Sequence, residues 1–177
     1  GIALADVDAI AFGQGPGAFT GLRIAVGVVQ GLAFALDKPV LPVSSLAAIA
    51  QRAHRLDGAE QVAVAIDARM DELYWGCYAL VEGRMQLQDI EQVCAPEQAS
   101  LPRNAAGDWL AAGTGWAVHA ERIPIAVSGQ ATEQLPHAED ILQLALYDWQ
   151  QGRHVPADEA LPVYLRDQVA TPKNPLL

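Results

Sequence analysis

The sequence has few charged residues and only two cysteines, and both shortages restrict the classes of function that the protein can have. Charged residues make up 18% of the 177 residues, against about 25% in an average soluble domain. Cys77 and Cys94 stand far apart without CxxC spacing, which argues against a disulfide framework or a zinc site. The histidines also lack metal-binding spacing. We expect no metal, no cofactor and a reducing compartment.

Basic residues are scarce as well. Eleven Lys and Arg residues stand against 21 Asp and Glu residues, giving a net charge of -10. Such a surface repels nucleic-acid phosphates, and no stripe of basic residues offsets it. The most apolar segment, 22–36, is shorter than the roughly 20 residues of a membrane-spanning helix, and no basic region precedes it as in a signal peptide. These patterns predict a cytoplasmic protein without a membrane anchor.

Strand and helix patterns alternate along the chain, which is typical of the α/β class. Strands are predicted at 7–12, 40–43, 61–66 and 73–81, the last returning as a hairpin over 85–93, and helices at 20–36, 44–54 and 138–149. Thr20 is the expected cap of the first helix, and Ser44 and Ser45 are candidate caps of the second. A boundary at Asp57-Gly58 divides the chain into a first lobe, 1–58, and a second lobe, 59–177, whose C-terminal tail can return to the first.

A glycine-rich loop, Gly13 to Gly17 with Gly15 between them, follows the first predicted strand. The spacing half fits a dinucleotide-binding fingerprint, but Pro16 removes one backbone N–H from the turn. A phosphate-binding P-loop is excluded because the first lysine of the chain is Lys38. Two interpretations stay open: a tight turn without a ligand, and a degenerate phosphate loop.

Asp67 ends another predicted strand, where nucleotide-binding lobes often place an acid. Ala68 and Arg69 occupy the positions where a phosphate-cradling glycine is needed. An exposed hairpin connection with a local Asp–Arg pair is therefore favoured. The alternative is a degenerate nucleotide site formed by Asp67 with the three loop glycines.

The helix predicted at 20–36 carries more apolar surface than one core needs. One stripe suffices for the core: Leu22, Val26, Val29, Ala33 and Leu36. Gly27 and Gly31 form a second row, although each glycine costs a helix about 1 kcal/mol against alanine. Close approach of another helix would justify them, and burial on both sides within the same lobe is the alternative. The candidate partner-binding residues are Arg23, Gly27, Gln30, Gly31 and Phe34.

No residue is predicted to be catalytic. The sequence has no GxSxG elbow, and Cys77 lies in an alternating strand, where a buried and inert thiol is usual. A peptidase would need an activated nucleophile that these patterns do not supply.

Several segments together resemble one family. They are DAIAFGQGPGAFTGLRIAVGVVQGLAFALDKPVLPVSSLAAIAQ, AIDARMDELYWGCYAL, AAGTGW, PHAEDILQLAL and LPVYLRDQVA, which cover most of the chain. They are similar to the TsaB (YeaZ) family. The resemblance implies a two-lobed, actin-like ATPase fold and a degenerate paralogue of TsaD, the subunit that carries the metal and the transferase site.

The resemblance also implies the function and the partners. The chain would be a non-catalytic scaffold that binds and activates TsaD, with the ATPase TsaE, for threonylcarbamoyl modification of adenosine 37 in tRNA. It would form a homodimer when alone and reach tRNA only through the complex. The alternatives are a nucleotide-binding ATPase or kinase of the same fold and a glycoprotease-like peptidase. The chain departs from the family pattern in lacking the opening strand hairpin and first helix.

We expect negligible tRNA affinity for the isolated chain at physiological salt, because a net charge of -10 opposes every phosphate contact. Fluorescence anisotropy of labelled tRNA measures this, with a titration at low salt as the control. Micromolar binding of tRNA without any partner would show that the prediction is wrong.

Overall fold

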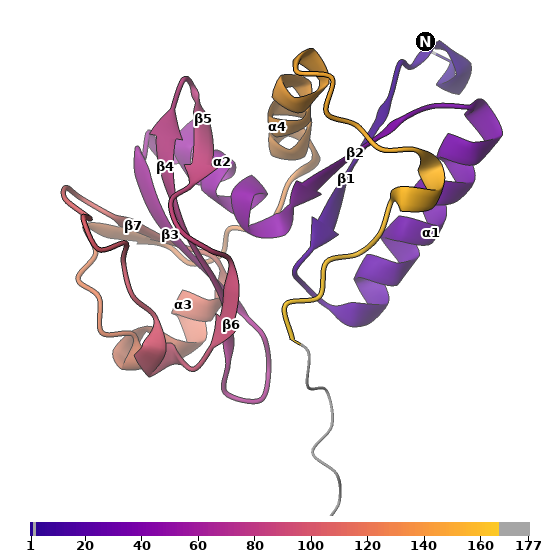
Figure 1. The fold of residues 1–177 in the computed structure, drawn as a ribbon. Coiled ribbons are helices and arrows are strands. Elements are labelled where there is room, and N and C mark those ends of the chain that lie inside the picture. The colour runs from indigo at the N-terminus through magenta and orange to yellow at the C-terminus, as the bar shows by residue number, and fades with distance from the viewer. Residues whose placement is uncertain (2, 167–177) are drawn as a thin grey trace, which may run out of the picture.

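The computed structural model describes residue 1 and residues 3–166, which form two sheets lying side by side (Figure 1). The first sheet is the parallel pair β1 (Ile10–Gly15) and β2 (Val40–Ser44). The second has six strands in the order β5-β4-β3-β7-β8, with β6 paired to β4. Its strands are β3 (Gln61–Asp67), β4 (Leu73–Val81), β5 (Arg84–Leu87), β6 (Gln92–Cys94), β7 (Leu110–Ala112) and β8 (Gly129–Ala131). The predicted α/β class is confirmed.

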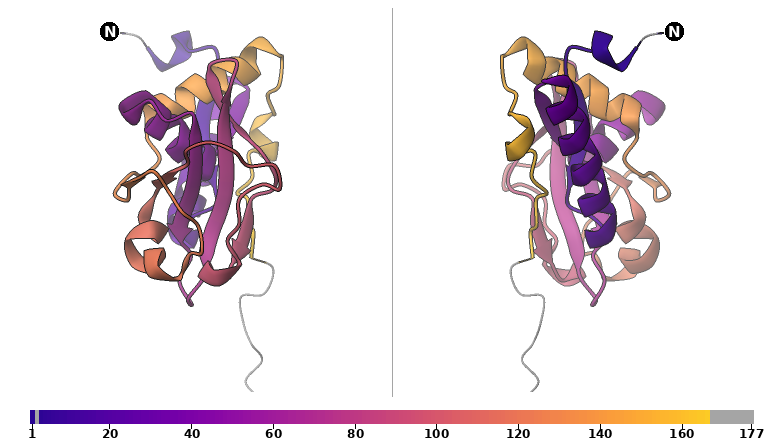
Figure 2. Two further views of the ribbon diagram at one scale, coloured as in Figure 1. Left: turned by 90° about the vertical axis from the view of Figure 1, so that its left-hand side faces the viewer. Right: turned by 90° about the vertical axis from the view of Figure 1, so that its right-hand side faces the viewer.

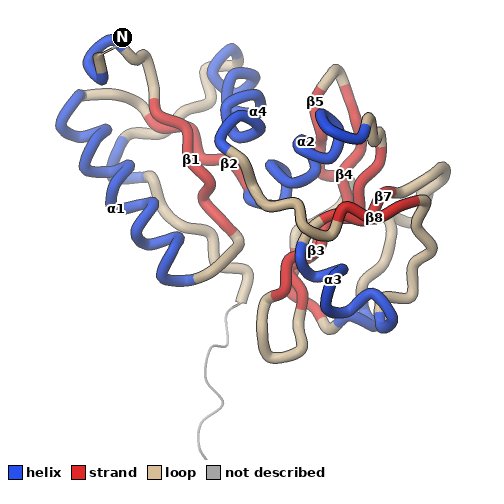
Figure 3. Tube along the Cα trace, turned by 180° about the vertical axis from the view of Figure 1, so that it is seen from behind, coloured by secondary structure: helices blue, strands red, loops and turns tan. Residues whose placement is uncertain are grey.

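Within residues 3–166, four α-helices cover these sheets: α1 (Phe19–Leu36), α2 (Ser45–Asp57), α3 (Thr114–His119) and α4 (Ala138–Gln150). Helix α1 lies on the outer side of the first sheet, and α2 and α4 lie between the two sheets (Figures 1 and 3). Helix α3 packs on β3 of the second sheet. Short 3-10 turns occur at Leu4–Asp6, Pro96–Gln98, Ala120–Arg122 and Ala157–Glu159.

Strand β4 is buried on both faces, which explains its apolar sequence. Trp75 and Cys77 face a cluster that includes Trp116 of α3, with the two indole rings 5.8 Å apart. Tyr78 faces the opposite cluster, under α2. The indole N–H of Trp116 donates to the carbonyl of Ala63 at 2.8 Å, so this large side chain is buried without an unpaired donor.

The predicted caps hold for α2 and fail for α1. The hydroxyl of Ser44 accepts from the backbone N–H groups of Leu46 and Ala47, as the sequence indicates. Helix α1 instead begins at Phe19, after Ala18, whose side chain makes no capping bond. Thr20 therefore lies inside the helix, and its predicted role as a cap is wrong.

The strand predicted to return over 85–93 is split in two. Strand β5 pairs with the end of β4, and β6 pairs with its beginning, with a bend between them. At this bend Glu91 accepts hydrogen bonds from the hydroxyls of Tyr78 and Ser44. Burial and the nearby Glu91 carboxylate raise the pKa of Tyr78 well above its ordinary value, so the phenol stays protonated and donates. The inward turn of Glu91 breaks the strand.

The two central helices meet through polar groups as well as through an apolar cluster that includes Ala47 of α2 and Leu144 of α4. Arg55 of α2 forms a two-pronged ion pair with Asp140 of α4, with both N–O distances at 2.8 Å, and Asp140 is fully buried. The amide of Gln51 donates to Gln143 at 3.3 Å and accepts from the backbone N–H of Met85 at 2.9 Å. Because α4 also packs on β1 and β2, this polar seam joins the two sheets.

The last described residues, 153–166, form an extended segment that we call the C-terminal strap. It passes the first sheet and runs beside α1, as the right-hand view of Figure 2 shows. Val155 pairs with Val40 of β2 through two backbone hydrogen bonds of 2.8 and 2.9 Å. The N–H of Val163 donates to the carbonyl of Gln14 in β1 at 2.8 Å. The lobe boundary near residue 58 stays a prediction, since α2 packs on the second sheet and α4 on the first.

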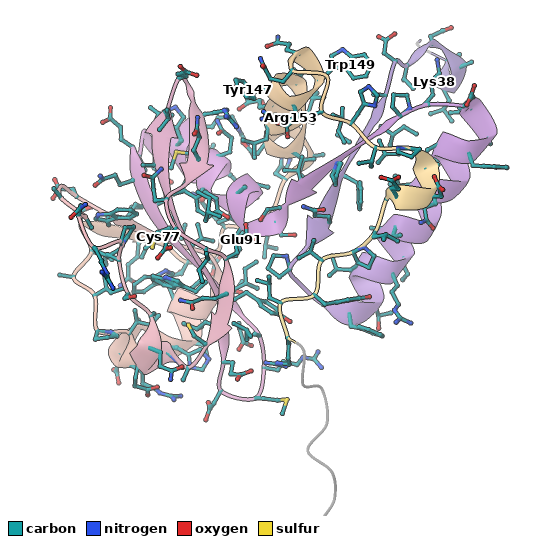
Figure 4. All side chains as sticks on the ribbon, in the orientation of Figure 1. Lys38, Cys77, Glu91, Tyr147, Trp149 and Arg153 are labelled. Atoms are coloured by element: carbon teal, nitrogen blue, oxygen red, sulfur yellow. The ribbon has the colours of Figure 1, made fainter. Side chains whose placement is uncertain are left out.

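We predict that Asp140→Asn lowers the melting temperature by roughly 10 °C, because it leaves the Arg55 guanidinium without its buried carboxylate partner. Thermal unfolding followed by circular dichroism measures the change. The control is Asp148→Asn, which removes a partly exposed ion pair with Arg153, a residue labelled in Figure 4. It should shift the midpoint by about 2 °C or less. Equal small shifts in both variants would contradict the prediction.

Candidate functional site

Helix α1 has one buried apolar face and one exposed apolar face. Its core face consists of Leu22, Val26, Val29 and Ala33, each at most 8% exposed. At about 100° per residue, Gly31 lies on the opposite side of the helix, in one row with Ile24 and Gly27. Ile24, Val28 and Phe34 are 63%, 56% and 85% exposed, which is unusual for large apolar residues. Among the described residues, no part of the chain covers this face.

The two helical glycines on this face have no intramolecular reason to be glycine. A Cβ atom added to Gly27 or Gly31 meets no other atom within 4 Å. Both positions have ordinary helical backbone geometry, so a side chain would introduce no strain. Glycine therefore weakens the helix here without relieving any contact inside the described chain.

The other predicted partner-binding residues differ in their surroundings. Phe34 is 85% exposed among the described residues. Gln30 donates through its amide to the carbonyl of Ala160 in the strap at 3.1 Å. Arg23 is exposed, lies 4.0 Å above the ring of Phe19, and donates to the hydroxyl of Tyr164 at 3.2 Å. The structure thus brings Arg23 and Gln30 against the strap, a neighbour that the helical pattern alone did not reveal.

The length and composition of α1 also meet the minimum for crossing a membrane. The helix has 18 residues with a mean hydropathy of 1.6. The most apolar segment of the sequence, 22–36, is shorter than the helix, which begins at Phe19. The observed packing of one face on β1 accounts for part of this apolar character.

Gly15 of the glycine-rich loop is required by internal packing. Its φ angle is +110°, and a Cβ atom there would lie 2.9 Å from the carbonyl oxygen of Val163 in the strap. A Cβ on Gly13 would lie 3.4 Å from the side chain of Ile141, while one on Gly17 would make only an ordinary contact with Leu22. Close approach of the strap therefore explains the central glycine without a bound phosphate.

Asp67 ends β3 beside the turn to β4, as predicted, but its partner is not the one expected. Its carboxylate accepts from the backbone N–H of Arg69 at 3.2 Å and lies 3.5 Å from Nε2 of the buried His119. The predicted side-chain pair with Arg69 is wrong, because Arg69 has a left-handed backbone and only its N–H binds the carboxylate.

The strap continues from Gly15 to this same turn. The guanidinium of Arg166 donates to the carbonyls of Ala68 and Arg69 at 3.1 and 3.3 Å, and it pairs with Glu72. The glycine-rich loop and the Asp67 turn, predicted as two parts of one degenerate nucleotide site, are thus bridged by the chain's own C-terminal segment.

The described residues contain no group of three or more His, Cys, Asp or Glu side chains that could hold a metal ion. Cys77 is buried within the second sheet (Figure 4), and burial raises the pKa of its thiol to about 12. Burial also raises the pKa of Cys94. Neither thiol has the thiolate character of a nucleophile at neutral pH.

Fold and site together define a mixed α/β protein whose most distinctive surface is an exposed apolar helix. The family model described as "TsaD: tRNA N6-adenosine threonylcarbamoyltransferase" matches residues 1–172. The chain is 42% identical to the tRNA threonylcarbamoyladenosine biosynthesis protein TsaB of Haemophilus influenzae, covering 99% of this chain and 77% of that protein. It is 40% identical to the protein of the same name from Escherichia coli, with 99% and 78% covered.

Comparison with a solved structure also indicates the TsaB (YeaZ) family. The structure titled "YeaZ from Pseudomonas aeruginosa" is 60% identical with a TM-score of 0.89, and the match covers 93% of this chain and 76% of that one. The chain belongs to the TsaB (YeaZ) family.

The buried thiols lead to a prediction about reactivity. Between pH 7 and 9 Cys77 should stay protonated in the folded protein and react slowly with Ellman's reagent, because a thiol with a pKa of about 12 forms almost no thiolate there. Cys94, whose pKa burial also raises, should react more slowly than a free thiol. Both should react fully in concentrated urea, which is the control. Fast reaction of Cys77 in the native protein, identified by Cys77→Ser, would contradict the assignment of a buried thiol.

Proposed function

We propose that this chain is a non-catalytic subunit that binds and activates TsaD for threonylcarbamoyl modification of adenosine 37 in tRNA. The names of its relatives support this pathway. The observation that carries the proposal is the exposed face of α1, where two glycines are surrounded by large apolar side chains and no described residue covers them. A helix of another protein that packs closely against this face would explain both features.

The match to the TsaD family model supports TsaD as the occupant of this face. Since the model of that family matches residues 1–172, we propose that TsaD shares the fold of this chain and presents a helix equivalent to α1. Two such helices can pack across an approximate two-fold axis, as equal surfaces do in a symmetric dimer. The same geometry allows a second copy of this chain to bind when TsaD is absent, so the homodimer and the heterodimer exclude each other.

The remaining parts of the proposal follow from this arrangement. We propose a two-lobed, actin-like architecture of which this chain forms the part without the family's opening strand hairpin and first helix. Among the described residues, β2 is the only strand that pairs with β1, and the strap adds one hydrogen bond from Val163 to Gln14. TsaE joins the pair in the cytoplasm, and tRNA is reached through the complex because the charge of this chain disfavours direct contact.

We predict that Gly31→Leu weakens binding to TsaD about tenfold to a hundredfold, because the added side chain forces the two helices apart at a cost of about 1–3 kcal/mol. Isothermal titration calorimetry measures the affinity. The melting temperature should stay the same or rise, since the new side chain meets no atom within 4 Å and leucine favours a helix over glycine.

The matched control is Gln150→Leu, which adds a leucine to an exposed position of α4, outside this face. It should leave the affinity for TsaD unchanged. Unchanged binding of Gly31→Leu would remove α1 from the interface and overturn the proposal. A tRNA modification assay with TsaD and TsaE then tests activation, which should fall in parallel with the affinity.

A further inference from the structure

We infer that the docking surface is composite: it consists of the outer face of α1 together with Tyr164 of the C-terminal strap, which Arg166 anchors to the second sheet. This inference rests on the proposed function and extends it to a segment distant in sequence. It assigns a binding role to Tyr164 and a positioning role to Arg166.

Tyr164 lies at the first turn of α1, next to the candidate docking residues. Its ring is 5.6 Å from the ring of Phe19, and its hydroxyl accepts from Nε of Arg23 at 3.2 Å. The guanidinium of Arg23 lies 4.0 Å from the centre of the Phe19 ring. Tyr164 remains 44% exposed and Phe19 55% exposed, so both rings retain free surface.

Phe19, Arg23 and Tyr164 form a cluster that adjoins the row of Gly27 and Gly31 on the surface of α1. On a helical projection Arg23 lies about 80° from Gly31 and about 40° from Gly27, toward the flank where the strap contacts Gln30. A partner helix that covers the glycine row therefore also reaches the cluster. Tyrosine, arginine and other aromatic residues are the types that carry most binding energy in protein interfaces.

The charge of Arg23 indicates which chemical group a partner presents near the N-terminal end of α1. Arg23 is the only charged residue of α1. Within the described residues its recorded neighbours are an aromatic ring and a phenol, and no carboxylate pairs with it. A partner helix with an apolar face and one carboxylate opposite Arg23 has the matching chemistry.

The strap holds Tyr164 in place through contacts on both sides. Before it, the N–H of Val163 donates to Gln14 of β1. After it, Arg166 pairs with Glu72 and donates to two carbonyls of the β3–β4 turn. The position of Tyr164 beside α1 thus depends on a turn that belongs to the other sheet.

Three variants of the full chain test this inference by calorimetric titration with TsaD. Tyr164→Ala should weaken binding about tenfold. Tyr164→Phe should change the affinity by less than about threefold, because it keeps the ring and loses only the contact of its hydroxyl with Arg23. Arg166→Ala should weaken binding to an intermediate extent and increase hydrogen exchange at the Val163 amide.

The control is Leu142→Ala, which shortens an exposed residue of α4 outside the surface and should leave binding unchanged. Melting temperatures establish that each variant is folded, and the milder Tyr164→Phe remains informative should Tyr164→Ala unfold. A more than tenfold loss in Tyr164→Phe would show that the hydroxyl, and not the ring, acts, and would overturn the inference as stated.

Comparison with Gly31→Leu separates this inference from the proposed function. Normal binding by Tyr164→Ala together with weak binding by Gly31→Leu would overturn the composite surface and leave the docking helix intact. Normal binding by both variants would overturn the composite surface as well as the proposed docking role of α1. Normal affinity of Arg166→Ala, with faster exchange at Val163, would remove the positioning role of Arg166.

Discussion

The buried ion pair between Arg55 and Asp140 is the contact on which the arrangement of the two sheets depends. A fully buried carboxylate is stable only with a well-placed partner, so α4 must lie where the guanidinium of Arg55 reaches it. Because α4 packs on the first sheet and α2 mainly on the second, this requirement restricts how the sheets lie relative to each other. An apolar seam would allow sliding that two-pronged hydrogen bonding does not.

The C-terminal strap provides a second connection at the other end of β1. It pairs with both strands of the first sheet and ends on the β3–β4 turn of the second. The sheets are thus held by an ion pair between helices and by a backbone segment that crosses from one to the other. With the inner side occupied in this way, the outer face of α1 is left as the apolar surface available to a partner.

Glycine serves opposite purposes in two parts of this chain. At Gly15 a positive φ angle and the carbonyl of Val163 exclude any side chain, so the residue is needed for the fold. At Gly27 and Gly31 there is space for a side chain, so the residue is not needed for the fold of the described chain. Glycine therefore indicates internal packing at Gly15, whereas at Gly27 and Gly31 it supports a contact with another protein. Only the surrounding atoms distinguish them.

The sequence by itself determined the α/β class, the strands β2, β3 and β4, the cap of α2 at Ser44, and the apolar stripe and glycine row of α1, because these depend on neighbours along the chain. It misplaced the start of α1 and joined β5 to β6, since Ala18 lacks a capping side chain and Glu91 turns inward to hydroxyls distant in sequence. Tertiary structure alone decided that Arg55 pairs with Asp140, that the strap covers Gly15, and that Tyr164 lies beside Arg23. Each of these contacts joins residues 85 or more positions apart, and no local pattern specifies such a distance.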